Sequence, residues 1–233
     1  AAFAVDAVEA AKKADVAVLF IGLTDEFESE GFDRTHLRIP PEHVALLSAI
    51  RGVTENIVVV LAGGAVVEMP WIGETKALLN SYLGGEASGS AVTDILFGDV
   101  NPSGKLADTI PDSYDSYQNA QEFLTGFEHL DYFDDIYVGY RYFETIPGAA
   151  QKVRYPFGFG LSYTDFEFSG AFCGESDGKI VAAVTVKNIG KVPGKEVVQL
   201  YYSAPQGKLG KPAKELAAFK KTKLLSPGES EAI

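Results

Sequence analysis

Cysteine, methionine and tryptophan each occur once among the 233 residues of the chain. Cys173 alone excludes a disulfide within the chain and a metal site built from several cysteines. The three histidines, His36, His43 and His129, show no metal-ligand spacing, so we expect neither a metal nor another cofactor. No hydrophobic run approaches the roughly 20 residues that cross a bilayer, so we expect no membrane partner.

Basic residues are also scarce, with 20 Lys and Arg against 32 Asp and Glu and a net charge of −12. A surface of this sign repels a phosphate backbone, so nucleic acid is not expected as a partner. The acidity is confined to residues 1–177, which hold 10 basic and 28 acidic side chains, whereas residues 178–233 hold 10 basic and 4 acidic. Such a shift favours a domain boundary, and the 46% hydrophobic content provides for a sizeable core.

Up to residue 110 the sequence alternates helical and strand patterns. Residues 16–21 and 57–61 are uninterrupted hydrophobic runs, typical of strands covered on both faces in a parallel sheet. Further strands are expected over 77–79 and 106–110, and helices over 4–13, from Pro40 onward, and over 88–97. This order predicts an α/β fold, a three-layer α/β/α sandwich with a mainly parallel sheet.

A different pattern follows Pro111. Residues 112–135 hold seven acids and no Lys or Arg, which indicates a long irregular connection, and we extend that connection to residue 163. Strands are then expected over 180–186, 196–202 and 220–225, too few for the roughly seven of a complete immunoglobulin-like sandwich. We therefore predict two domains, 1–163 and 164–233, of which the second is partial and all-β.

The acidic segment 24–34 is the strongest candidate for chemistry. It follows the carboxyl end of the first predicted strand, where open α/β sheets place their ligand sites. Five carboxylates lie within nine residues, which favours a raised pKa for one of them, and Arg34 can keep Asp33 ionised. Few apolar side chains lie in the segment, so we expect it to be weakly anchored. A solvated acidic loop without chemistry is the alternative.

Three other features have a structural and a functional interpretation. Gly63-Gly64 follows a strand, but no Lys-Ser/Thr comes after it, so a packing turn is favoured over a phosphate loop. Trp71 could stack on the ring of a ligand, yet its apolar surroundings favour a core position. The aromatic run Tyr137, Tyr140, Tyr142 and Phe143 favours packing between domains over a ligand cleft.

Several motifs resemble glycoside hydrolase family 3. Residues 28–34 read Glu-Ser-Glu-Gly-Phe-Asp-Arg, and together with 37–40 they are similar to the acid/base segment in the second domain of that family. Three further stretches agree with the family: 98–106 resembles its helix-to-strand junction, and 135–143 and 155–164 resemble its segment leading into a fibronectin type III-like last domain. Val184–Tyr202 resembles central strands of the latter domain, and the bacterial β-glucosidases are the most similar members.

The resemblance implies a retaining β-glucosidase. An aspartate on a (β/α)8 barrel would form a glycosyl-enzyme, and a glutamate of the second domain would act as acid and then as base. The following Gly-Phe-Asp-Arg favours Glu30 as that glutamate, a different family spacing favours Glu28, and Glu26 is a third choice. The nucleophile belongs to the barrel, which can precede or follow these domains, so this chain alone is expected to be inactive.

The partners implied by the resemblance are a β-glucoside or oligosaccharide and the barrel domain from the rest of the polypeptide. Homo-oligomer formation is left open. The alternative from a different class is a non-catalytic carbohydrate-binding or scaffolding module that keeps the fold. A flavodoxin-like nucleotide binder would suit the α/β pattern, but the sequence has no phosphate-binding loop.

Overall fold

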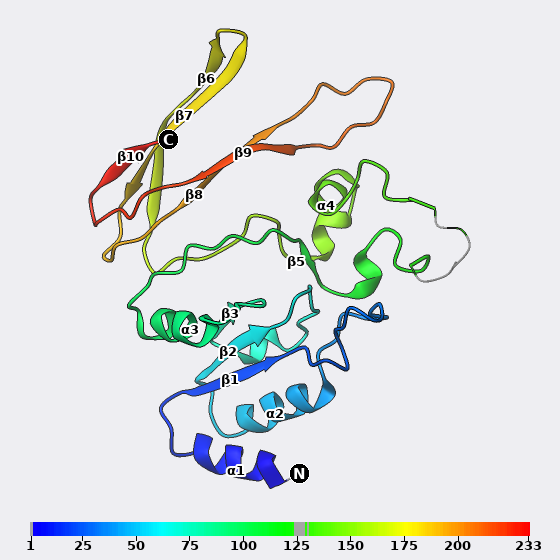
Figure 1. Cartoon of the computed structure of the whole chain (residues 1–233), viewed down its shortest axis with the longest axis vertical. Coiled ribbons are helices and arrows are strands. Elements are labelled where there is room, and N and C mark those ends of the chain that lie inside the picture. The colour runs from blue at the N-terminus through cyan, green and yellow to red at the C-terminus, as the bar shows by residue number, and fades with distance from the viewer. Residues whose placement is uncertain (1, 124–128, 130) are drawn as a thin grey trace. The chain divides into compact units, whose positions relative to one another are not determined.

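The chain divides by its internal contacts into two compact units. A computed structural model describes residues 2–123, 129 and 131–233 (Figure 1). The first unit comprises residues 1–90 and 110–133, and the second comprises 91–109 and 134–233. The chain therefore passes from one unit to the other three times. The domain boundary after residue 163 stays a prediction, and the predicted connection over 112–135 falls in part on 124–128 and 130, outside the described residues.

The first unit is built on a parallel sheet with the strand order β1-β2-β3 (Figure 1). The strands are β1 (Ala17–Gly22), β2 (Ile57–Ala62) and β3 (Ala77–Asn80). Helices α1 (Ala2–Ala11) and α2 (Pro41–Arg51) alternate with them, and Pro41 occupies the first turn of α2, where its missing N–H costs nothing. Short 3-10 helices cover Ile72–Glu74 (η1) and Tyr114–Ser116 (η2), and a two-residue strand β4 covers Ile110–Pro111. The predicted α/β class with a parallel sheet is confirmed.

The central strand β2 forms the core of the first unit. Ile57, Val59 and Val60 are buried, and α2 contributes Leu47 and Ile50. Adjacent residues Val59 and Val60 point to opposite faces of a strand, so both faces of β2 are covered, as the uninterrupted hydrophobic run predicts.

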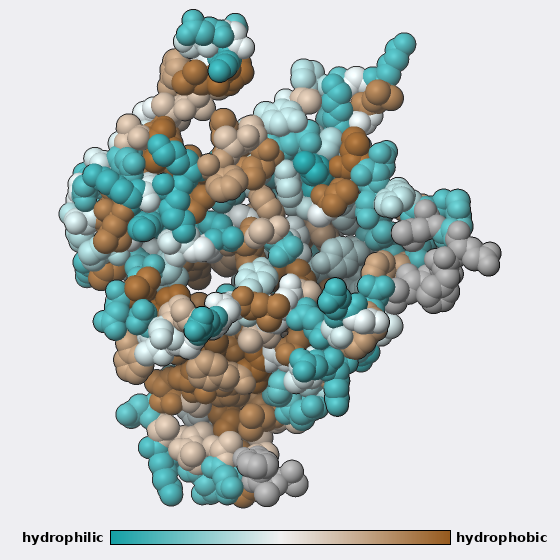
Figure 2. All heavy atoms as spheres, viewed as in Figure 1, coloured by the Kyte–Doolittle hydropathy of each residue, from teal (hydrophilic) through white to brown (hydrophobic). Residues whose placement is uncertain are grey.

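The edge strand β1 differs from this prediction. Leu19 and Ile21 are buried, but Val18 and Phe20, on the other face, are 43% and 66% exposed. The expectation that both faces of this strand are covered is therefore wrong for the part of the chain that the structure describes. Figure 2 shows hydrophobic, brown surface over the region in which Figure 1 draws β1.

The second unit holds the all-β region. One antiparallel sheet has the order β10-β7-β6, and a second antiparallel pair joins β8 and β9. The strands are β6 (Phe166–Ser176), β7 (Lys179–Asn188), β8 (Val197–Tyr202), β9 (Glu215–Lys221) and β10 (Ser230–Ala232). The all-β prediction is confirmed, and the strands predicted over 180–186 and 196–202 correspond to β7 and β8.

Two predicted strands differ from the structure. The strand expected over 106–110 is only the short β4, because Leu106 instead bonds through its backbone to Phe159 and Gly158. The strand expected over 220–225 lies earlier, as β9, whose pairing with β8 ends at Lys221. Helix α3 (Ser88–Phe97) follows the prediction. The remaining elements are α4 (Tyr140–Thr145), η3 (Ala149–Lys152) and β5 (Val153–Tyr155).

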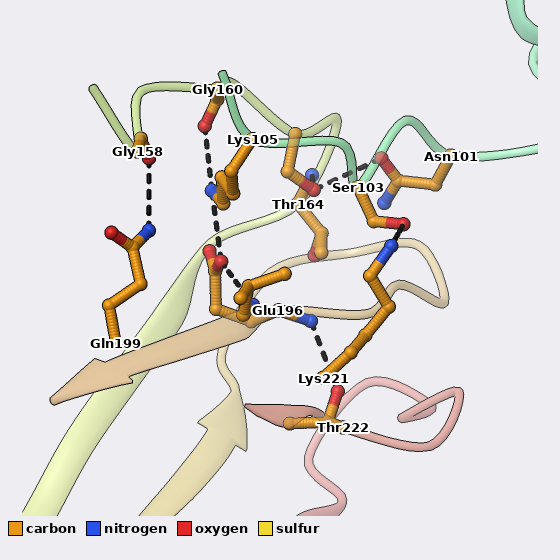
Figure 3. Close-up of polar contacts among 12 residues, drawn as sticks. Asn101, Ser103, Lys105, Gly158, Gly160, Thr164, Glu196, Gln199, Lys221 and Thr222 are labelled. Atoms are coloured by element: carbon orange, nitrogen blue, oxygen red, sulfur yellow. Dashed lines mark hydrogen bonds and ion pairs between the residues drawn. The ribbon is translucent and has the colours of Figure 1, made fainter. Parts of the chain in front are cut away.

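Polar side chains tie irregular segments of the second unit to the strand β8 (Figure 3). Lys105 Nζ donates to the Gly160 carbonyl at 2.7 Å and forms an ion pair with Glu196 Oε1 at 2.9 Å. The side chains of Lys105 and Glu196 are only 16% and 14% exposed. Gln199 Nε2 donates to the Gly158 carbonyl at 3.1 Å. Two segments far from β8 in the sequence, around 105 and around 160, are thus held by a nearly buried ion pair and its hydrogen bonds.

Tyr140 and Phe143 of the aromatic run pack inside the second unit, and Tyr140 meets rings on both sides of the predicted domain boundary. The Tyr140 ring stacks on Phe157 with centroids 4.5 Å apart and meets Tyr201 edge-on at 6.3 Å. The Tyr140 hydroxyl accepts the Leu216 N–H at 2.9 Å, and Phe143 is buried. These contacts account for Tyr140 and Phe143 without a ligand.

Candidate functional site

The acidic loop starts where β1 ends, beside the loop that follows β2. The parallel register pairs Gly22 with Ala62, and Leu23 N–H continues the pairing by donating to the Ala62 carbonyl at 2.9 Å. Only glycine fits at position 22, because a Cβ there would lie 1.7 Å from the Ala62 carbonyl oxygen. The Thr24 carbonyl then accepts the N–H groups of Phe27 and Glu28, which forms a first turn.

A second, tighter turn carries Glu30. Ser29 and Phe32 form an antiparallel bridge, with Glu30 and Gly31 between them. Gly31 N–H donates to Ser29 Oγ at 3.2 Å, which supports the turn from within. Glu30 is exposed, and its carboxylate makes no hydrogen bond or ion pair with any of the described residues. Glu30 is therefore available to a molecule that approaches the turn.

Glu28 is held by the neighbouring loop. Its Oε2 accepts the Gly64 N–H at 2.6 Å, and the side chain is half-buried. A Cβ at Gly64 would lie 3.2 Å from both carboxylate oxygens, so the absence of a side chain at position 64 leaves room for this contact. The Gly63-Gly64 pair is a packing turn, as the sequence predicts, and it also binds a carboxylate, which the sequence did not predict.

Arg34 reaches the same neighbouring loop from the other end of the turn. Its Nη1 donates to the Val66 carbonyl at 2.9 Å, and its Nη2 donates to the Arg38 carbonyl at 3.4 Å. Burial lowers the pKa of the guanidinium, while the negative charges of Glu28 and Glu68 act in the opposite direction. Arg34 forms no ion pair with Asp33 among the described residues, so the expected pairing of these two neighbours is replaced by contacts with backbone carbonyls.

The histidines and the tryptophan near this loop have structural roles. His43 Nδ1 lies 3.1 Å from the Gly22 carbonyl oxygen, and His36 Nδ1 accepts the Arg38 N–H at 3.2 Å. Trp71 is buried in the core, as expected. No cluster of three metal-ligating side chains occurs within the described residues. Nor does any described helix combine the length and hydrophobicity needed to cross a bilayer.

A half-open hollow of about 230 Å³ lies in the second unit. Its lining residues are Thr109, Tyr140, Phe143, Glu144, Ala150, Val153 and Pro156. Glu144 is the only carboxylate among them, and it forms an ion pair with Lys214 at 3.0 Å. The hollow thus offers no free acid or base, and the acidic loop of the first unit remains the better candidate site.

Sequence reasoning located the loop but missed what holds it. Gly64 N–H and the Val66 carbonyl, the backbone groups that bind Glu28 and Arg34, lie more than 30 residues further along the chain. The available signal was the predicted parallel pairing of the first two strands, since their carboxyl ends, and hence their loops, meet at one edge of the sheet. The loop is held at both ends, in contrast to the weak anchoring expected from its composition.

Comparison with protein families assigns both parts of the chain. Residues 2–163 match the glycosyl hydrolase family 3 C-terminal domain, and residues 196–233 match a fibronectin type III-like domain. The chain belongs to glycoside hydrolase family 3.

Similar proteins include enzymes of known activity. The chain is 46% identical over 232 residues to thermostable β-glucosidase B of Acetivibrio thermocellus, covering 98% of this chain and 30% of the relative. It is 39% identical to an exo-α-(1→6)-L-arabinopyranosidase of Bifidobacterium longum, again covering 98% of this chain and 30% of the relative. The crystal structure of the Bifidobacterium adolescentis family 3 β-glucosidase superposes with a TM-score of 0.93 at 42% identity, covering 100% of this chain and 34% of that one. The chain thus spans about a third or less of the length of these proteins.

Proposed function

We propose that this chain is part of a retaining β-glucosidase that removes terminal, non-reducing β-D-glucosyl residues, and that Glu30 is its general acid/base. The observation that carries the proposal is the free, exposed carboxylate of Glu30 on a turn after β1, in a chain of this family. The similarity to a β-glucosidase at 46% identity supports the substrate class. The nucleophile, an aspartate on a barrel domain, is supplied by the rest of the polypeptide.

Glu30 is preferred to Glu28 because of what each carboxylate contacts. Glu28 Oε2 already accepts a short hydrogen bond from Gly64 N–H, so this carboxylate is held by the protein's own backbone. Glu30 has no such contact among the described residues. Glu26 is also exposed, but it lies in the earlier turn formed on Thr24.

The proposed chemistry has two steps. Protonated Glu30 donates its proton to the glycosidic oxygen while the aspartate attacks the anomeric carbon, so the C–O bond breaks and a glycosyl-enzyme forms. The Glu30 carboxylate then removes a proton from water as the water oxygen attacks the same carbon and releases the aspartate. Glu30 ends protonated, and the sugar leaves with its original anomeric configuration.

A second sugar is supported by one observation. The 39% identity to an exo-α-(1→6)-L-arabinopyranosidase shows that relatives of this chain include an enzyme with another named specificity. An α-L-arabinopyranoside lacks the C5 hydroxymethyl group of a β-D-glucopyranoside and has the opposite configuration at C4, but in both the leaving group is attached through an equatorial bond at the anomeric carbon. The same acid/base geometry therefore serves either substrate.

The test uses the full-length polypeptide with 4-nitrophenyl glycosides. We expect kcat/KM to be highest for the β-D-glucoside, with NMR showing β-glucose as the first product. A higher value for the α-L-arabinopyranoside would favour the second sugar. Initial release of α-glucose would contradict a retaining mechanism, and no turnover of any glycoside would favour the non-catalytic module.

A further inference from the structure

Two side chains of the 24–34 loop bind the backbone of the loop that follows β2. Glu28 Oε2 accepts the Gly64 N–H at 2.6 Å, and Arg34 Nη1 donates to the Val66 carbonyl at 2.9 Å. The arrangement is complementary: the Glu28 carboxylate binds a backbone donor at position 64, and the Arg34 guanidinium binds a backbone acceptor at position 66. Hydrogen bonds with one charged partner are roughly twice as strong as neutral ones. The two loops are therefore joined at two points.

The two contacts flank the turn that carries Glu30. Glu28 comes just before the Ser29–Phe32 bridge that closes this turn, and Arg34 comes shortly after it. We infer that Glu28 and Arg34 are positioning residues that fix the Glu30 turn for proton transfer; with the backbone groups they bind, they form what we call the clamp. This inference rests on the proposed role of Glu30.

The turn has little else to hold it. Glu30, Gly31 and Phe32 are all exposed, so burial of apolar surface contributes little to its position. Proton transfer needs the carboxyl within roughly 2.6–3.2 Å of the glycosidic oxygen. A displacement of about 1 Å can cost about 10²-fold in rate. The contacts of the clamp tie both flanks of the turn to the loop that follows β2.

Arg34 is suited to this role by its charge and its shape. Its Nε is buried and has no hydrogen-bond partner among the described residues, while Nη1 and Nη2 each reach a backbone carbonyl. Burial lowers its pKa, against the opposing negative charges of Glu28 and Glu68, and a guanidinium stays charged in a protein. Lysine carries a single point charge and cannot reproduce the planar pair of donors. Arg34→Lys therefore keeps the charge and removes the geometry.

Gly64 offers a probe that changes no charge. A Cβ at this position would lie 3.2 Å from both Glu28 oxygens and 3.0 Å from Leu83 Cδ1, a movable side-chain end. The backbone of Gly64 is outside the positive-φ region, so alanine is sterically allowed there. Gly64→Ala should displace the Glu28 carboxylate by a few tenths of an ångström. Gly73→Ala is the matched control, because a Cβ at Gly73 meets nothing within 4 Å.

The experiment measures kcat/KM of the full-length enzyme for aryl β-glucosides with poor and with activated leaving groups. Glu28→Gln, Arg34→Lys and Gly64→Ala are each made in the wild-type and in a Glu30→Gln background. We expect a loss between about 10-fold and 10²-fold for the poor leaving group and a smaller loss for the activated one. In the Glu30→Gln background, the ratio of kcat/KM for the activated leaving group to kcat/KM for the poor one should not change further, because the clamp acts through Glu30. Gly73→Ala should match the wild type.

The possible failures separate the two proposals. The clamp is overturned if its variants lose kcat/KM equally for all leaving groups. It is also overturned if they change the ratio of kcat/KM between the activated and the poor leaving group further in the Glu30→Gln background. Either result leaves the role of Glu30 intact. If Glu30→Gln by itself leaves the ratio of kcat/KM between activated and poor leaving groups at its wild-type value, the proposed function fails. If Glu28→Gln alone shows the full leaving-group effect with rescue by azide, Glu28 is the acid/base and both proposals fall. Circular dichroism during thermal unfolding verifies that each variant folds.

Discussion

Glu30→Gln in the full-length enzyme is expected to slow hydrolysis of glucosides with poor leaving groups by about 10²–10⁴-fold, the usual contribution of general acid catalysis. An activated aryl group leaves without a proton, so the first step of its hydrolysis slows far less. Hydrolysis of the glycosyl-enzyme then lacks a base. Azide needs no base, so it should restore turnover of the activated substrate and give a β-glucosyl azide, measured by chromatography.

Asp25→Asn provides the control for this prediction. Asp25 is exposed in the same acidic loop, and the change removes one carboxylate while keeping its size. We expect wild-type rates for all leaving groups and no response to azide. If Asp25→Asn and Glu30→Gln behave alike, the loss reflects the charge of the whole loop, and Glu30 has no specific role.

Lys105→Met is expected to destabilise the second unit by about 3 kcal/mol, because it leaves the Glu196 carboxylate nearly buried without its cation. The Gly160 carbonyl also loses its donor. Replacing both charged partners, as in Lys105→Met/Glu196→Leu, should recover part of the loss, since an uncompensated charge costs more than an absent pair. Hydrogen exchange of the β8 and β9 amides measures the free energy of opening of this unit.

Lys221→Met is the matched control for Lys105. Lys221 Nζ donates to Ser103 Oγ at 3.1 Å, but this contact is exposed, and we expect a change within about 0.5 kcal/mol. Trp71 lies in the first unit, so its fluorescence reports whether that unit is affected. Similar losses of stability for Lys105→Met and Lys221→Met would show that the Lys105–Glu196 pair does not owe its stabilising effect to burial.

Hydrophobic patterning predicted most of the fold. The hydrophobic run over 57–61 predicts a strand, and Pro41 predicts the start of a helix. The types of these elements in the first unit were therefore predictable from local sequence. The pattern failed for the far face of β1, because hydrophobic side chains also occur on protein surfaces and the run alone does not tell a covered face from an exposed one. It also misplaced β9, whose central Ala217 and Ala218 have low strand propensity and whose limits are set by pairing with β8.

The candidate site was predictable only in part. The spacing of carboxylates and the motif around Glu30 identified the loop, because such residue types are rare together after a strand. The distinction between Glu28 and Glu30 depends on Gly64, a residue 36 positions beyond Glu28, which only the fold brings near. Nearly every residue has a backbone N–H, so the residue type at position 64 does not show which side chain binds there, and for that reason sequence reasoning kept both glutamates.

Neither compact unit is a continuous stretch of chain, and this affects the order in which the protein can be completed. On the ribosome, residues 91–109 of the second unit emerge before residues 110–133, which complete the first. The first unit cannot finish folding until part of the second has been synthesised. A chimera joined after residue 163 would combine Lys105 from one parent with the residue at position 196 from the other. Recombination between family members at that point should succeed mainly where both parents supply a matching pair.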